Sequence, residues 1–308
     1  MQSLSPEESM AGEAAAQVAA ALQKKGEENV RLKDILDAFG KILIEQARWK
    51  ALLPNSPIGE LTSATREKFE KGLPIADRTQ IIRLGDLWQT AADKLIPSMQ
   101  EAFSGIAAQL QRLQTAILQD GSFPDSFIEA AYGNDIERAR EMAAGTGIDA
   151  ELLLFVLQHL ARPVLEKRAE ALFGQIRDLP WSRGYCPVCG SFPEVSFLMG
   201  KEGRRVLRCS FCASTWHFYR LSCPFCETEN PDDREILFVE DQPEERAEVC
   251  HKCKTYVTAI DLRNPPETSV QAILHLCLMH LDVIAQKKGF NPMKGIGWKA
   301  VSSELKEP

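Results

Sequence analysis

The sequence lacks the features of two large classes of protein. Among its 308 residues no uninterrupted apolar run reaches the roughly eighteen residues that a membrane-spanning helix needs. The nearest run, Leu152–Leu157, is interrupted by Gln158. Positive charge is also scarce, because 36 Lys and Arg stand against 43 Asp and Glu and give a net charge of -7. Nucleic-acid binders gain much of their affinity by neutralising phosphates, so this balance weighs against such a partner.

Signals for secretion and for enzyme chemistry are also missing. The first ten residues contain no basic leader, and the Ala-rich run that follows is too weakly apolar for a secretory signal. We therefore expect a soluble, cytoplasmic protein without membrane insertion. No nucleophile with a paired base, phosphate-binding loop or carboxylate pair stands out along the chain, which favours a protein that is not an enzyme.

Cysteine, in contrast, is abundant and regularly spaced. Eight of the nine cysteines form four Cys-x-x-Cys pairs, which are Cys186 with Cys189, Cys209 with Cys212, Cys223 with Cys226, and Cys250 with Cys253. Such a turn lets two thiolates reach one metal ion, and two turns complete a tetrahedral four-sulfur site. Disulfides suit an oxidising compartment, whereas no secretory signal is found here. A thioredoxin-like motif needs a single pair in a βαβ setting, whereas this chain has four pairs. Four pairs in series therefore indicate two metal sites.

The spacing favours a sequential grouping of the pairs. The first two are separated by residues 190–208 and the last two by residues 227–249, both compatible with four-cysteine ribbons. An interleaved grouping, as in cross-braced zinc domains, is the alternative. A four-sulfur set suits zinc and iron alike, so the residues leave the metal open. Glycine tolerates the positive φ that such a turn tends to need, and it follows only the first pair, as Gly190.

The pattern of the chain predicts an α+β protein: an N-terminal all-helical domain followed by two tandem four-cysteine ribbons and a C-terminal helix. Before Pro180, apolar residues recur at helical spacing, whereas short β-like runs alternate with the cysteine turns beyond it. The expected divisions are a flexible N-terminal segment over 1–28, a helical domain over 29–180, a first ribbon over 181–221, a second ribbon over 222–265, and a C-terminal helix and tail over 266–308.

Two long helices are expected in particular. One begins near Asp86 and runs to about Gln119, with Pro97 expected to kink or divide it. The other spans about Thr268–Lys288 and places Cys277, the ninth cysteine, on its apolar face. A buried structural thiol is the expected role of Cys277. His217, between two aromatic residues, is expected to be structural, although it falls on the strand that enters the second ribbon and is therefore of interest.

The cysteine region resembles a known family. The resemblance rests on Arg183–Ser191, Leu207–Cys212, Trp216 and His217, Arg220, Cys223–Cys226, Glu248–Tyr256 and the C-terminal Leu281–Phe290. These runs are similar to the formate dehydrogenase accessory protein (FdhE) family. The resemblance is specific from about residue 180 to 292, and over the helical half it is only architectural.

The resemblance implies a fold, a cofactor and a partner. It implies that the two ribbons are rubredoxin-like and that each binds one iron ion through four cysteines. It also implies a cytoplasmic accessory protein that helps the catalytic subunit of a respiratory formate dehydrogenase to mature, without oxidising formate itself. A homodimer is a further implication.

Two other functions remain open at this stage. Rubredoxin-like ribbons could pass electrons to a partner as an electron-transfer module. A zinc-ribbon nucleic-acid adaptor is weaker. It would rest on a modest basic and aromatic cluster, whose members are Arg204, Arg205, Arg208, Arg220, Trp216, Phe218 and Tyr219. The acidic second ribbon counts against it.

Overall fold

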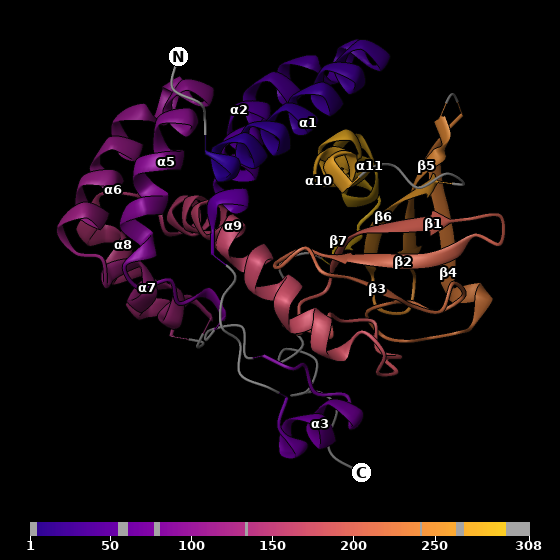
Figure 1. Ribbon diagram of the computed structural model, residues 1–308. Coiled ribbons are helices and arrows are strands. Elements are labelled where there is room, and N and C mark those ends of the chain that lie inside the picture. The colour runs from indigo at the N-terminus through magenta and orange to yellow at the C-terminus, as the bar shows by residue number, and fades with distance from the viewer. Residues whose placement is uncertain are drawn as a thin grey trace. The chain divides into compact units, whose positions relative to one another are not determined.

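The chain folds into two compact units. This computed structural model describes residues 5–54, 61–76, 81–132, 135–240, 242–262 and 268–293 (Figure 1). The helical unit comprises residues 1–55 and 79–167, and the sheet unit comprises residues 56–78 and 168–308. The expected division into five segments remains a prediction.

The described part of the helical unit consists of helices that pack against one another. Its helices are α1 (Pro6–Glu28), α2 (Lys33–Leu52), α5 (Leu87–Ala102), α6 (Ala107–Gln119), α7 (Phe123–Tyr132), α8 (Ile136–Thr146) and the first part of α9 (Ala150–Ile176). The core contains the fully buried Trp88, whose indole N–H donates to the Asp125 carboxylate at 2.7 Å. Within the described residues no helix is both long enough and apolar enough to cross a membrane.

Two elements of this unit can be compared with expectation. Of the frayed helix or mobile tail expected before residue 29, the structure shows a helix, α1, over Pro6–Glu28. A reciprocal capping box between Ser5 and Glu8 begins this helix, and its small residues pack against α2. The helix expected from Asp86 continues through Pro97 and ends at Ala102 instead. The chain leaves the helix at Phe103, whose ring packs edge-on against Phe39 at 5.2 Å.

The sheet unit contains two ribbons of the same design. Each consists of a Cys-x-x-Cys turn, a β-hairpin, a second Cys-x-x-Cys turn and a third strand. The first ribbon has strands β1 (Pro193–Met199), β2 (Arg204–Cys209) and β3 (Thr215–His217); the second has β4 (Arg234–Val239), β5 (Gln242–Cys250) and β6 (Thr255–Leu262). The internal repeat seen in the cysteine spacing is therefore also a repeat of structure.

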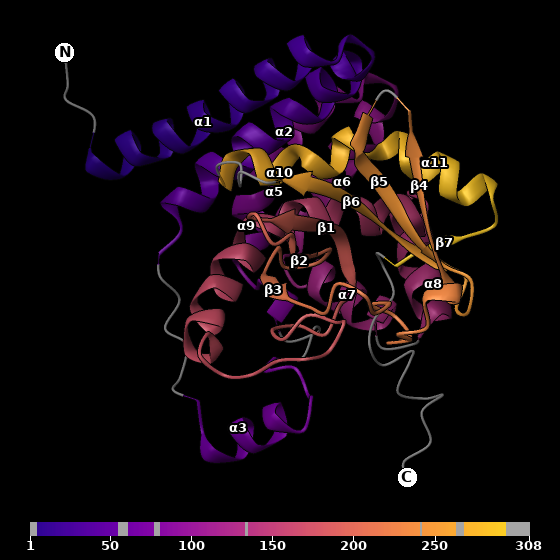
Figure 2. The same cartoon turned by 90° about the vertical axis from the view of Figure 1, so that its right-hand side faces the viewer.

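One sheet joins the two ribbons. Its strand order is β3-β2-β1-β6-β5-β4, with the short β7 (Asn291–Pro292) added beside β6. Strands within each ribbon are antiparallel, but β1 and β6 pair in parallel, from Val195 beside Thr258 to Met199 beside Leu262. Figure 2 shows β1 of the first ribbon beside β6 of the second. The fold class is thus confirmed, with the two ribbons fused through their first and last strands.

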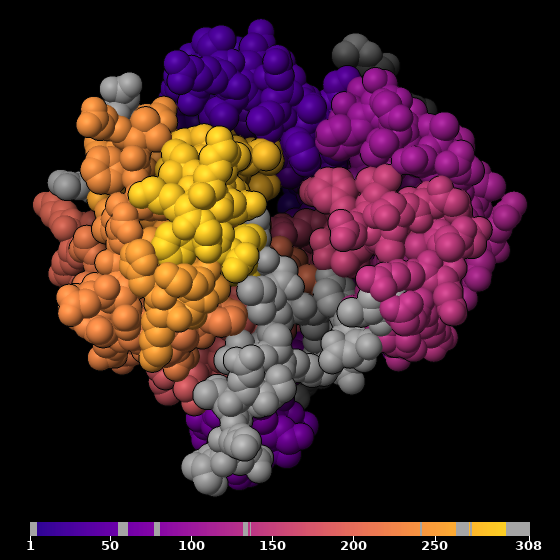
Figure 3. Space-filling model, turned by 180° about the vertical axis from the view of Figure 1, so that it is seen from behind, coloured from indigo at the N-terminus to yellow at the C-terminus, as the bar shows by residue number. Residues whose placement is uncertain are grey.

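C-terminal helices cover one face of this sheet. The expected single helix is divided at Leu278 into α10 (Thr268–Cys277) and α11 (Met279–Lys287). The division lets both segments direct apolar side chains at the sheet, where Leu274, Leu278 and Leu281 pack against Val195, Phe197 and Tyr256. Figure 3 shows these helices, in yellow, lying beside the orange strands of the second ribbon.

A buried arginine links the ribbons across the sheet. The Arg205 side chain on β2 is completely buried, and its guanidinium pairs with the carboxylate of Glu248 on β5. It also donates to the Ser196 hydroxyl at 3.1 Å and to the Ser222 carbonyl oxygen at 2.8 Å. Burial lowers the pKa of Arg205, and the charge of Glu248 opposes that shift. Ser222 directly precedes Cys223, so this network holds the start of the second ribbon against the first.

Replacing Glu248 should therefore destabilise the sheet unit. Glu248→Gln leaves Arg205 buried without its counter-charge, and we expect a loss of about 3 kcal/mol in unfolding free energy. The matched control is Glu202→Gln. Glu202 pairs with Arg204 at 3.0 Å, but both side chains are exposed, by 73% and 71%. That exposed pair should contribute below about 1 kcal/mol. Thermal unfolding measurements that show equal losses for both variants would contradict the linking role of Arg205.

Candidate metal centres

Each Cys-x-x-Cys turn is set by its place beside a strand. Cys209 is the last residue of β2 and Cys250 the last residue of β5, so the second turn of each ribbon begins where a hairpin strand ends. The first Cys-x-x-Cys turn of each ribbon precedes the hairpin and lies close to the second turn. Their backbones close in the same way: the Gly190 N–H donates to the Cys186 carbonyl oxygen, and the Glu227 N–H to that of Cys223, both at 2.9 Å.

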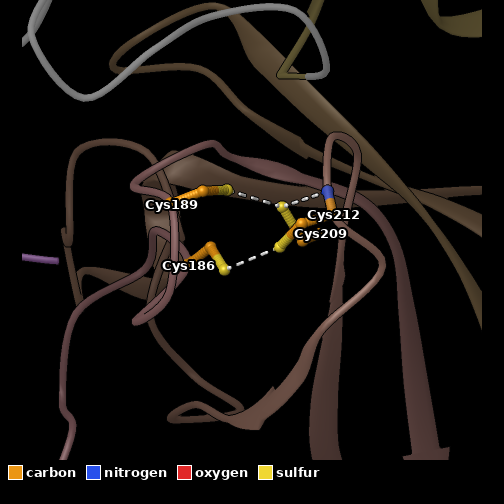
Figure 4. Close-up of side chains that lie close together, drawn as sticks. All are labelled: Cys186, Cys189, Cys209 and Cys212. Carbon is orange, nitrogen blue, oxygen red and sulfur yellow. Dashed lines mark hydrogen bonds between the residues drawn. The ribbon is translucent and has the colours of Figure 1, made fainter. Parts of the chain in front are cut away.

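The first cluster brings together the sulfurs of Cys186, Cys189, Cys209 and Cys212. Figure 4 shows one turn directing Cys186 and Cys189 toward the pair on the facing turn. The Cys186 Sγ lies 3.6 Å from that of Cys212, and the Cys189 Sγ lies 3.4 Å from that of Cys209. All four residues are at most 1% exposed. Backbone N–H groups of Val188 and Phe211 point at the sulfurs of Cys186 and Cys209.

The second cluster has the same plan but is less enclosed. It joins Cys223, Cys226, Cys250 and Cys253. The Sγ atoms of Cys223 and Cys253 are 3.7 Å apart, as are those of Cys226 and Cys250. Cys223 and Cys250 are buried, whereas Cys226 and Cys253 are partly exposed.

Both clusters fit a tetrahedral metal ion. Metal–sulfur bonds of about 2.3 Å place neighbouring sulfurs of a tetrahedron roughly 3.8 Å apart, and the shortest separations found here are 3.4–3.7 Å. No disulfide forms among these described cysteines. The grouping is the sequential one that the spacing favours, not the interleaved alternative. The two sets of four could each hold one metal ion.

The residue after each turn adopts a left-handed backbone. Its φ is +73° at Gly190, +58° at Ala213, +53° at Glu227 and +57° at Lys254. Glycine reaches this region without strain, whereas a residue with a Cβ pays roughly 1–2 kcal/mol. The turn geometry is therefore the same in all four cases, although only one position carries glycine. The left-handed conformation is imposed by the folding of each turn around its cysteine sulfurs.

A hydroxyl residue follows each of these left-handed positions, a pattern that the sequence analysis missed. The four residues are Ser191, Ser214, Thr228 and Thr255. The Ser191 hydroxyl lies 3.4 Å from the Cys189 sulfur, Ser214 lies 3.3 Å from that of Cys212, and Thr255 lies 3.1 Å from that of Cys253. Thr228 instead donates to Asp233 at 2.9 Å. The repeated Ser or Thr two residues after each pair was a readable signal.

Burial and the close sulfurs shift the thiol pKa values in different directions. Burial raises the pKa of Cys186 and Cys212 well above the ordinary range, and it raises that of Cys226 to about 11. Hydrogen bonding from Cys223 lowers the pKa of Cys253 to about 5. Without an ion, each cluster thus holds protons near neutral pH. Metal uptake must release them, so apparent affinity should rise with pH.

Close packing between the two ribbons couples the clusters. Gly184, two residues before Cys186, lies against the third turn so tightly that an added Cβ would sit 1.8 Å from the Pro224 carbonyl oxygen. Phe192, just beyond the first turn, packs against Phe225 in the third, with ring centroids 4.9 Å apart. Any side chain at position 184 would push the two turns apart.

Other residues singled out by the sequence lie away from the clusters. Cys277 is buried on α10, as expected of a structural thiol. His217 lines a largely apolar cavity of about 880 Å³ beside β3, together with Trp181 and Trp216. Two members of the basic cluster are unavailable to phosphates, because Arg205 and Arg208 are buried and pair with Glu248 and Glu194.

Comparisons with known proteins agree with this architecture. A family model described as "FdhE, central domain" matches residues 185–220, the part that holds the first cluster. "Protein FdhE homolog" of Aquifex aeolicus is 33% identical over 147 residues, which are 47% of this chain and 51% of that protein. "Protein FdhE" of Salmonella paratyphi B is 28% identical over 235 residues, 75% of this chain and 71% of that protein.

The resemblance to the FdhE family is confirmed. A solved structure extends it to the fold: the crystal structure of the FdhE protein from Pseudomonas aeruginosa matches with a TM-score of 0.60. That match covers 94% of this chain and 95% of the other, at 18% identity. The sequence match to the Aquifex FdhE homolog spans about half the length of that protein. The FdhE-like fold thus includes the helical part as well as the two clusters.

The left-handed turn positions lead to a stability prediction. Lys254→Gly should raise the unfolding free energy by about 1 kcal/mol, because glycine adopts the observed φ without steric strain. The control is Lys252→Gly in the same turn, where φ is not positive and glycine only adds freedom to the unfolded chain. Chemical denaturation should show gain in the first variant and loss in the second. A loss in both would contradict the strain at Lys254.

Proposed function

We propose that this protein is an FdhE-type accessory protein that helps a formate dehydrogenase to mature. The observation that carries the proposal is the pairing of two four-sulfur clusters with an FdhE-like fold over nearly the whole chain. In this function the protein works in the cytoplasm on a respiratory enzyme, binds its catalytic subunit and is not itself an enzyme. The helical unit and the ribbons would share the binding of that subunit.

Metal ions would give the ribbons their stability. Each ribbon is too small to bury a large core alone, and structural metal ions in small domains contribute on the order of 10 kcal/mol. We propose iron in both clusters, with Cys186, Cys189, Cys209 and Cys212 as ligands of one ion and Cys223, Cys226, Cys250 and Cys253 as ligands of the other. The four-sulfur chemistry suits iron and zinc equally, so the choice of iron rests on the family resemblance.

Electron transfer is a second candidate function. Partial exposure of Cys226 and Cys253 favours it, because a sulfur near the surface shortens the path to a redox partner. Reversible bleaching of an iron chromophore by cellular electron donors would support this function. The nucleic-acid adaptor has no comparable support, since two of its four arginines are buried in ion pairs.

Metal analysis tests the ligand assignment. Protein purified without oxygen should contain two ions and absorb visible light through thiolate-to-iron charge transfer. Cys209→Ser should reduce the content to about one ion, held by the second cluster. Cys277→Ala, which alters the cysteine outside the clusters, should keep both. A colourless protein with stoichiometric zinc would contradict the assignment of iron. A protein that contains no metal would contradict both metal centres.

A pull-down tests the partner. The tagged protein serves as bait in its native cytoplasm, kept anaerobic and grown with formate respiration induced. We expect it to recover a formate dehydrogenase catalytic subunit and to lose it when Cys186 and Cys189 are both replaced by Ser. The Cys277→Ala bait should retain it. Recovery of nucleic acid or unrelated redox proteins alone would contradict the proposed accessory function.

A further inference from the structure

The two clusters differ in how far solvent reaches their sulfurs. Every cysteine of the first cluster is at most 1% exposed. In the second cluster Cys226 and Cys253, the later cysteine of each turn, are partly exposed. The sulfur sets otherwise match in spacing and in turn geometry, so the difference must come from what surrounds them.

A separate piece of chain lies against the first turn of the first cluster. We name residues 69–76 the covering strap; they begin at the end of helix α3 (Ser63–Glu70) and continue beyond it. The N–H of Ile75 donates to the carbonyl oxygen of Pro187, and that of Ala76 donates to Val188, both at 2.9 Å. Pro187 and Val188 are the two residues between Cys186 and Cys189. The strap therefore pairs directly with the backbone of the metal-binding turn.

Side chains fasten the strap at its other end. The Tyr185 hydroxyl, next to Cys186, donates to the Gly72 carbonyl oxygen at 2.7 Å. The Phe69 ring packs on Trp181 at 4.7 Å, and the Trp181 indole donates to the Tyr185 carbonyl oxygen at 2.8 Å. All these residues lie in the sheet unit. Reaching the first cluster through this turn would require these contacts to open.

The fourth turn, which holds Cys250 and Cys253, is open by comparison. The residues between its cysteines, His251 and Lys252, are exposed, and so is Lys254. His251 contacts Glu235 at 2.9 Å on the protein surface. Lys252 and Lys254 thus flank the partly exposed Cys253 in the sequence. Their positive charges lie at the fourth turn of a ribbon that is otherwise acidic, and they attract an anionic ligand at short range.

We propose that the second cluster exchanges its metal ion with an external anionic donor or acceptor of the thiolate or carboxylate class, while the first keeps its ion. Cys253 and Cys226 are the ligands that the incoming group replaces first. In each replacement one bond forms between the metal ion and the external ligand, and one metal–sulfur bond to a cysteine breaks. No oxidation or reduction is involved. This inference rests on the proposed presence of metal ions in both clusters.

Release kinetics test the difference between the clusters. Full-length protein loaded with two zinc ions is mixed with excess of the chromogenic chelator 4-(2-pyridylazo)resorcinol. We expect two phases of equal amplitude, the slower one about ten- to a hundredfold slower, because opening the strap breaks several hydrogen bonds at once. Iodoacetamide labelling followed by peptide mass spectrometry should modify Cys226 and Cys253 during the fast phase.

Strap variants test the cause. Tyr185→Phe removes the bond to Gly72 and Ile75→Pro removes a donor to the turn; both leave all eight sulfurs in place. Each should speed the slow phase without altering the fast one. Tyr219→Phe, at a tyrosine that is 65% exposed, should change neither phase. Tyr185→Phe keeps the test valid if Ile75→Pro fails to fold.

The opposite outcomes are distinct. Equal release rates, or early labelling of the first cluster, would overturn the exchange role while leaving two metal centres in place. Uptake of no ion by either cluster would overturn the proposed metal centres and this inference together.

Discussion

The fold of the sheet unit depends on bringing eight cysteine sulfurs together at two points. The backbone adopts strained conformations where they are needed to achieve this. Each turn closes through a left-handed residue even where Ala213, Glu227 or Lys254 must bear the strain. Strands β2 and β5 both end on a cysteine, so each hairpin places the second Cys-x-x-Cys turn of its ribbon beside the first. Four-sulfur coordination would hold these turns more firmly than the small cores beneath them.

The two ribbons form one body because polar and steric contacts join them. The parallel pairing of β1 and β6 makes their sheets continuous. The buried Arg205 connects strands of both ribbons with the residue before Cys223. Gly184 permits backbone contact between the first and third turns. The two clusters therefore belong to one continuous sheet, although their exposures to solvent differ.

The sequence predicted the local features of this fold better than the contacts between distant segments. Cysteine spacing alone indicated both sulfur groups, because the chemistry of a four-sulfur site leaves few groupings. The sequence suggests Arg205 only as a member of a basic and aromatic cluster, since a lone charge gives no sign of a buried partner 43 residues away. Residues 69–76 were placed with the helices, because nothing in their composition reveals backbone pairing with Pro187 and Val188. The helix break at Phe103 likewise depends on a ring in another helix.

The parallel pairing of β1 with β6 also constrains how the chain is made. The two strands are the first of one ribbon and the last of the other, with the whole second hairpin between them. As the protein emerges from the ribosome, the edge of β1 has no partner until Thr255–Leu262 follows. At typical synthesis rates that delay lasts several seconds, during which an unpaired edge strand is open to association with other chains.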